Sequence, residues 1–104
     1  MRIAGRDVAD EALKDLCRKW KICRLALFGS ARTGLLGPES DVDLLADFEP
    51  DETWSLMDLA RAEEDFAGLI GRRVDLVDRA SLQRSANRFR RDAILNSAEV
   101  IYAA

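Results

Sequence analysis

The amino-acid sequence predicts an α+β fold in which a mixed β-sheet has helices packed mainly on one face. Amphipathic helical stretches alternate along the chain with short, strongly apolar segments that are typical of buried strands. The first two predicted strands are joined by about ten residues without a helical pattern. Because a parallel crossover needs a longer link, we expect these two strands to pair antiparallel, and a mixed sheet follows.

The first predicted elements are a helix, a strand and a loop. Residues 7–21 form the helix, because Leu13 and Cys17 recur at helical spacing. Residues 24–30 are a compact apolar run that ends at a Gly-Ser pair, which indicates a buried strand breaking into a turn. Residues 31–40 contain two glycines and a proline and are expected to be a loop.

The middle of the chain predicts a second strand, a second helix and a third strand. Residues 41–48 form a strand that begins with two acids and is followed by a polar turn. Residues 53–70 show one apolar helical face, which includes Leu56, and Gly71 is a plausible stop signal. Residues 72–78 then form a short strand.

The last part of the chain predicts one long helix and a tail. Ser81 is the expected cap of a helix over residues 82–98, and residues 99–104 add a strand or only pack against the domain. A basic stripe with Arg90 beside it lies on this helix: Arg84, Arg88 and Arg91. We interpret that stripe as a solvated helix face, and an acidic partner or RNA as the alternative.

Other side chains receive structural interpretations. Three aromatic residues are expected to anchor a core or an interface: Trp54, Phe66 and Phe89. The acidic run at residues 63–65 is expected to be exposed helix surface.

Composition limits the function. With 104 residues, we expect residues 1–104 to form a single domain. The net charge of -3 argues against direct nucleic-acid binding, which depends on Lys and Arg neutralising phosphates. No segment has the ~20 apolar residues of a membrane helix, and the N-terminus lacks the apolar core of a signal peptide, so we expect a cytoplasmic protein without membrane contact.

The chain has no histidine, which removes the commonest general base and every Ser-His or Cys-His nucleophile. Its chemistry must therefore depend on carboxylates, a metal ion or basic side chains. Cys17 and Cys23 have no further Cys or His to complete a zinc site, and we expect reduced, structural thiols.

The most informative pattern is a Gly-Ser turn, ten residues, and then Asp41-Val42-Asp43. Residues two apart on a strand point to the same side, so Asp41 and Asp43 should project together. Two such carboxylates repel each other unless a cation lies between them, and hard oxygen ligands suit Mg²⁺ or Mn²⁺. Taken alone, an Asp-x-Asp pair favours the alternative of a solvated strand end whose acids serve solubility.

The residues around this pattern favour a site. Gly29 permits close backbone approach, and the Ser30 hydroxyl with nearby amides can bind phosphate oxygens. A third carboxylate would complete a site for two metal ions, and Asp75, inside an apolar strand, supplies it best. Asp47 has the same parity as the first two acids but lies too far along its strand, and Asp78 is expected to cap a turn.

The stretches GSARTGLLGPESDVDLL and VDLVD resemble the minimal nucleotidyltransferases of the DNA polymerase β superfamily. The resemblance implies a polymerase β-like nucleotidyltransferase core, ATP as the substrate, and Mg²⁺ (or Mn²⁺) held by Asp41, Asp43 and Asp75. We expect four residues to contact the nucleotide: Gly29, Ser30, Arg32 and Ser40. Family members often have Arg immediately before the glycine that matches Gly34, whereas this chain has Thr33 there.

The resemblance also implies a partner. Such short proteins often pair, as a hetero-oligomer, with a helical HEPN-type toxin, and act as antitoxins that transfer AMP to a tyrosine of that ribonuclease. Two alternatives remain open: a non-catalytic antitoxin that neutralises its toxin by direct binding, and nucleotidyl transfer to a small molecule with a helper subunit. The toxin role itself is excluded, because HEPN ribonucleases have an Arg-x-His pattern and this chain has no histidine.

Overall fold

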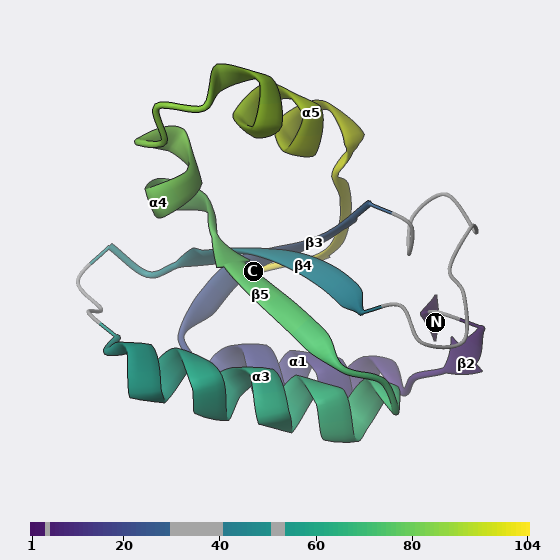
Figure 1. Ribbon diagram of the computed structural model, residues 1–104. Coiled ribbons are helices and arrows are strands. Elements are labelled where there is room, and N and C mark those ends of the chain that lie inside the picture. The colour runs from purple at the N-terminus through teal and green to yellow at the C-terminus, as the bar shows by residue number, and fades with distance from the viewer. Residues whose placement is uncertain (4, 30–40, 51–53) are drawn as a thin grey trace.

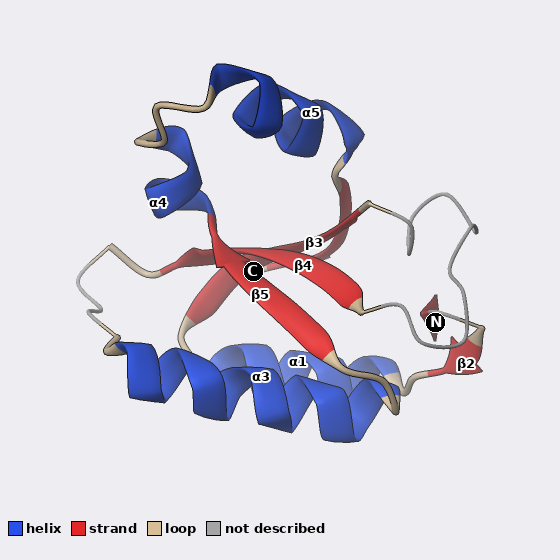
Figure 2. Ribbon diagram, in the orientation of Figure 1, coloured by secondary structure: helices blue, strands red, loops and turns tan. Residues whose placement is uncertain are grey.

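The computed structural model describes residues 1–3, 5–29, 41–50 and 54–104, and its centre is a four-stranded sheet (Figures 1 and 2). The strands lie in the order β5-β4-β3-β6. Their bounds are β3 (Ile22–Phe28), β4 (Val42–Phe48), β5 (Val74–Asp78) and β6 (Glu99–Ala103). β3 pairs antiparallel with β4 and with β6, whereas β4 and β5 are parallel. The predicted α+β fold with a mixed sheet is confirmed.

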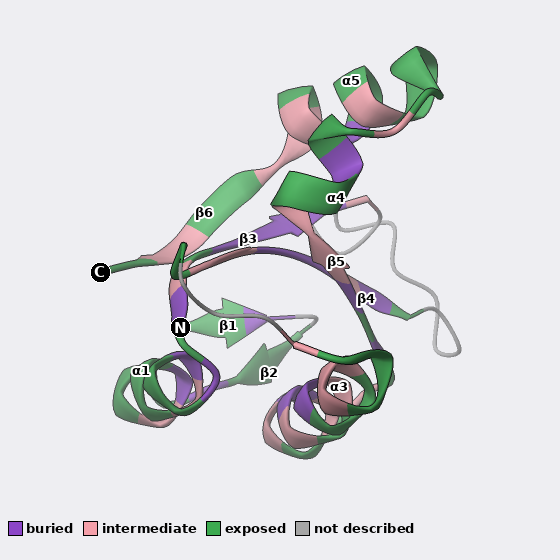
Figure 3. Cartoon of the chain, turned by 90° about the vertical axis from the view of Figure 1, so that its left-hand side faces the viewer, coloured by how far each residue is buried: buried purple, intermediate pink, exposed green. Residues whose placement is uncertain are grey.

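Two helices, α1 (Asp10–Lys19) and α3 (Leu56–Ile70), lie side by side under one face of the sheet (Figure 3). They enclose the larger hydrophobic core, in which Phe66 is fully buried. This is the main helical layer that the sequence predicted. The predicted place of Leu56 on the buried face is wrong: it is 87% exposed, because it lies at the first position of α3, at the edge of the layer.

The ends of α3 follow from local chemistry. The Ser55 hydroxyl accepts a hydrogen bond from the Asp58 amide, and the Asp58 carboxylate accepts one from the Ser55 amide, which forms a capping box. Gly71 ends the helix with a positive φ of 81°, as its predicted role as a stop signal requires. Because α3 connects β4 to β5, those two strands can run parallel.

A smaller layer covers part of the opposite face of the sheet and consists of α4 (Arg79–Gln83) and α5 (Arg88–Ser97). Its core is a separate cluster: Ala26, Phe28, Leu45, Leu82 and Ile94. The prediction of one helix over 82–98 capped by Ser81 is wrong. Two separate caps explain the break, since the Asp78 carboxylate accepts from the Ala80 amide and the Asn87 side chain accepts from the Arg90 amide.

Both ends of the chain add strands. A short hairpin that the sequence did not predict, β1 (Arg2–Ile3) with β2 (Arg6–Asp7), precedes α1. The C-terminal tail forms β6 and pairs with β3, which settles the choice between a strand and simple packing. Within the described residues, no helix combines the length and the apolar character needed to cross a membrane.

Candidate active site at the start of strands β4 and β5

Two of the predicted acids are direct neighbours in the sheet. Asp43 on β4 and Asp75 on β5 are register partners in the parallel pairing. Leu45 and Val77 follow them two residues later and belong to the core under α4 and α5, so strand alternation directs both acids to that same face. The sheet therefore brings together two carboxylates that are 32 residues apart in the chain.

Gly29, at the end of β3, lies against this pair. A Cβ atom added to Gly29 would be 2.6 Å from the Asp43 carboxylate oxygen Oδ2, and the residue has a positive φ of 68°. Both facts favour glycine at this position. The close approach predicted for the Gly29 backbone is present, although the group that lies close to it here is the Asp43 carboxylate.

Asp41 immediately precedes β4 and is engaged elsewhere. Its carboxylate oxygen Oδ1 lies 3.2 Å from Arg73 Nε, and the Val42 amide donates to the Arg73 carbonyl at 2.8 Å. Within the part of the chain that the structure describes, no three acidic side chains converge closely enough to hold a metal ion. Asp41 would have to leave Arg73 to join Asp43 and Asp75 on one cation.

The electrostatics of Asp43 nevertheless fit a cation. Burial raises the pKa of Asp43, and the carboxylates of Asp75 and Asp41 raise it further, while the Arg90 guanidinium lowers it. Mutual repulsion among oxygen donors is relieved when a hard divalent ion binds between them. The donor set therefore suits Mg²⁺ or Mn²⁺.

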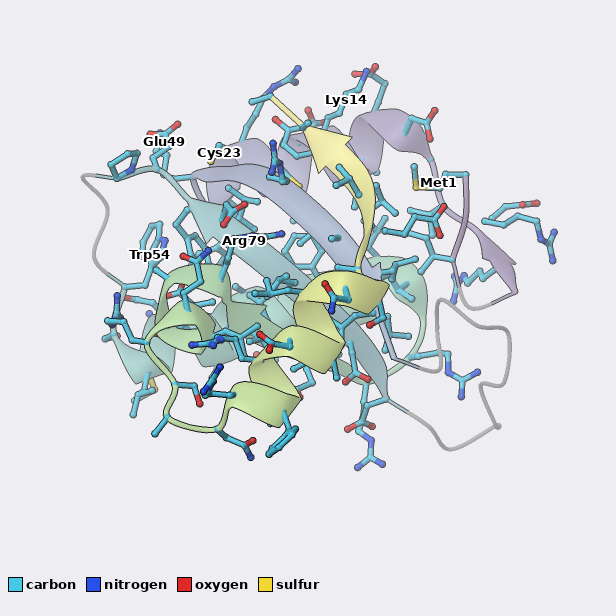
Figure 4. All side chains as sticks on the ribbon, turned by 90° about the horizontal axis from the view of Figure 1, so that it is seen from above. Met1, Lys14, Cys23, Glu49, Trp54 and Arg79 are labelled. Atoms are coloured by element: carbon cyan, nitrogen blue, oxygen red, sulfur yellow. The ribbon has the colours of Figure 1, made fainter. Side chains whose placement is uncertain are left out.

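A cavity of about 360 Å³ opens over the acidic pair, and its lining includes Gly29, Asp43, Asp75 and Arg90. A larger hollow, of about 490 Å³, lies at the opposite ends of β4 and β5, near Trp54. Figure 4 views the α4–α5 face and shows Trp54 with Glu49 and Arg79 on that opposite side. The hollow at the acidic pair, although smaller, is the one lined by the predicted acids Asp43 and Asp75.

The remaining predicted residues divide into two groups. Ser30, Arg32 and Ser40 lie outside the described residues, as does the Thr33 departure. Asp47 is engaged away from the site, since its Oδ1 is 2.9 Å from Arg79 Nε, an ion pair without hydrogen-bond alignment. Asp78 accepts a hydrogen bond from the Ala80 amide and caps α4, in agreement with its predicted role as a cap.

Sequence reasoning missed two cations of the site, Arg73 and Arg90. Arg73 was assigned no role, and Arg90 was placed beside a solvated helix stripe. Only Arg90 had a signal that could have found it: its helical spacing to the small residues Ala93 and Ser97, which places the three on one face.

Comparison with known proteins finds a matching family and a named relative. Residues 9–101 match the family described as a nucleotidyltransferase domain. A Thermococcus cleftensis protein named protein adenylyltransferase MntA is 40% identical over 70 residues, which are 67% of this chain and 69% of that protein.

The solved structures that share the fold include the following two. The structure of a candidate minimal nucleotidyltransferase is 37% identical, with a TM-score of 0.66 and 86% of each chain covered. A complex of tri-AMPylated Shewanella oneidensis HEPN toxin with MNT antitoxin contains a chain that is 20% identical, with a TM-score of 0.61, covering 91% of this chain and 70% of that one.

Proposed function

Since this chain belongs to the nucleotidyltransferase domain family, we propose that it is a protein adenylyltransferase that transfers AMP from ATP to a tyrosine hydroxyl of a HEPN-type ribonuclease toxin. The observation that carries the proposal is the register pairing of Asp43 with Asp75 beside Gly29. The name of the Thermococcus cleftensis relative supports the reaction, and the AMPylated toxin in the Shewanella oneidensis complex supports the acceptor.

The proposed reaction joins the hydroxyl oxygen of the acceptor to the α-phosphorus of ATP. The bond from that phosphorus to the oxygen bridging to the β-phosphate breaks, and pyrophosphate leaves. The hydroxyl proton passes to a carboxylate, for which Asp75, exposed on the edge strand β5, is the candidate. Mg²⁺ or Mn²⁺, when held by Asp41, Asp43 and Asp75, supplies charge neutralisation for the triphosphate.

The remaining roles concern the nucleotide and the setting. Ser30, Arg32 and Ser40 contact the nucleotide together with Gly29, and residues 1–104 act as a single domain. The protein works in the cytoplasm, where ATP and a ribonuclease target are both present, and forms a hetero-oligomer with its toxin.

The decisive experiment follows transfer of label from α-labelled ATP to a HEPN-type protein from the neighbouring reading frame. Asp43→Asn should lower transfer at least about a hundredfold, because metal-assisted charge stabilisation contributes several kcal/mol. Neutralisation of the toxin should fail while the two proteins still co-purify.

Asp47→Asn is the matched control, since it removes an acid of the same strand and face that is paired with Arg79. Transfer should persist in this variant at a temperature where circular dichroism shows both variants folded. If Asp43→Asn neutralises the toxin as well as the wild type does, the chain is a binding module and the proposed catalysis is wrong. If the label appears in a small molecule instead of the toxin, the proposed tyrosine acceptor is wrong.

A further inference from the structure

Helix α5 forms a wall of the cavity over the acidic pair. Four of its residues, at the i, i+3, i+4 and i+7 spacing of one helix face, line this cavity: Arg90, Ala93, Ile94 and Ser97. The basic residues Arg88 and Arg91 of the same helix do not line it. One helix face therefore presents a single guanidinium, with small neighbours, toward Asp43 and Asp75.

The Arg90 guanidinium is placed for an additional ligand. Among the described residues it forms no ion pair within 4.0 Å, whereas Arg79 is paired with Asp47 and Arg91 with Asp92. It is still close enough to lower the pKa of Asp43. The cation thus faces the carboxylates across the cavity at more than ion-pair distance, and the space between them is open.

Charge alternation indicates what fits this space. Carboxylates bind a divalent cation, the cation binds phosphate oxygens, and those oxygens then expose negative charge on their far side. A guanidinium opposite the carboxylates complements that charge with several donors. Ala93 and Ser97 are small and leave room in the cavity beside it.

We propose that Arg90 of α5 binds phosphate oxygens of the nucleoside triphosphate, so that α5 is the second wall of the nucleotide site. The inference rests on the proposed function for the identity of the ligand. It adds a residue outside the Gly-Ser and Asp-x-Asp motif, and it assigns α5 a role in substrate binding that an exposed helix would not have.

Calorimetry on the full chain tests the proposal with Mg²⁺ and a non-hydrolysable ATP analogue. Arg90→Gln should weaken binding of the analogue about tenfold to a hundredfold, the size expected for losing a charged hydrogen bond. Binding of adenosine should be unchanged, and Arg90→Lys should recover part of the loss. Arg88→Gln is the control, because it removes another exposed arginine of α5 that lies outside the cavity lining.

The outcomes separate this inference from the proposed function. If Arg90→Gln binds the analogue as tightly as the wild type does, or if Arg88→Gln loses as much, the inference is wrong while AMP transfer can still be measured. Tighter Mg²⁺ binding without weaker nucleotide binding would make Arg90 only a counter-ion of the acids and overturn it. Wild-type protein that binds the analogue through Arg90 but transfers no AMP would disprove the proposed function alone. A wild type that binds no nucleotide overturns both.

Discussion

Gly29 shows how a single residue connects the fold to the site. Its positive φ already disfavours any side chain, and an added Cβ would meet the carboxylate of Asp43. We expect Gly29→Ala to destabilise the protein by about 1–3 kcal/mol, which lowers Tm by roughly 4–8 °C per kcal/mol in a domain of this size. Nucleotidyl transfer should fall as well, because Asp43 must move.

Gly68 supplies the control for this substitution. It lies exposed in α3, and an added Cβ would meet nothing within 4 Å. Gly68→Ala should therefore raise stability by about 0.5–1 kcal/mol through helix propensity. Thermal denaturation of the two variants should give shifts of opposite sign, and equal stability of Gly29→Ala and wild type would contradict the close approach.

Asp43 also makes stability depend on pH. Its folded pKa is raised above the value of 3.8 that it has when unfolded, so the folded state holds the proton more tightly. Stability from this group is complete below the unfolded pKa and is lost as pH rises through the folded pKa. In the absence of metal, Asp43→Asn should melt at a higher temperature than wild type at neutral pH, and the difference should vanish as the pH falls below 3.8.

Asp47→Asn should behave in the opposite way at neutral pH. It breaks the ion pair with Arg79, in which both side chains are less than a quarter exposed, at 22% and 24%, so Tm should fall. Mg²⁺ should raise the Tm of wild type and of this variant, but not that of Asp43→Asn. If metal-free Asp43→Asn has a lower Tm than wild type at pH 7, burial and the neighbouring carboxylates do not destabilise the ionised form of Asp43.

At the scale of elements, β5 illustrates how an edge strand is protected. β5 forms one edge of the sheet, and the Glu63 side chain on α3 accepts a hydrogen bond from the Leu76 amide at 2.9 Å. Glu63→Ala should cost about 1–3 kcal/mol, since it leaves a part-buried donor unpaired. It should also reduce transfer, because Leu76 adjoins Asp75. Denaturant titration and the label-transfer assay measure both effects.

Glu64→Ala tests whether this cost is specific. Glu64 is exposed and lies one residue along α3. The substitution should change stability by less than about 0.5 kcal/mol. If both variants lose equal stability, the hydrogen bond to Leu76 contributes nothing particular to β5.

The sequence predicted those helices and strands that depend on patterns among residues close together in the chain. The main strands and α3 follow from apolar periodicity and from Gly71, and the antiparallel first pair follows from the short link. Contacts between distant residues were not predictable in this way. The run at residues 63–65 was expected to be exposed surface, yet Asp65 accepts hydrogen bonds from Trp20 Nε1 and Lys19 Nζ, and Glu63 binds β5.

In the site, too, only features that depend on residues close together in the chain were predictable. Strand alternation predicted that Asp43 projects on the same side as Asp41 and that Asp75 supplies a third acid, but only the sheet register makes Asp43 and Asp75 neighbours. The ion pair of Asp41 with Arg73 has no local signal, because these residues immediately precede β4 and β5 and come together through the parallel pairing of those strands. Phe89, predicted to anchor a core or an interface, is 91% exposed and is therefore not in the core.

Across the whole molecule, the two helical layers should differ in stability. α3 buries Ala62, Phe66 and Ile70 in the larger core, whereas Ile94 is the buried residue of α5. Because opening a segment costs the apolar burial that it loses, α5 should open at a much lower free energy than α3 and the central strands. Hydrogen exchange should find α5 amides exchanging well before those of α3, and equal protection would contradict the difference between the layers.

The nucleotide should remove part of this difference if α5 is a wall of its site. Ligand that binds only the closed form stabilises it by RT ln(1 + [L]/Kd), so Mg²⁺ with a non-hydrolysable ATP analogue at about 100 times Kd should slow exchange in α5 up to about a hundredfold. Amides of α1, which packs on the opposite face, should change little where they exchange through local openings that leave the nucleotide site intact. In Arg90→Gln at the same analogue concentration, exchange in α5 should slow much less. If exchange in that variant slows as much as in the wild type, the ligand stabilises α5 through residues other than Arg90.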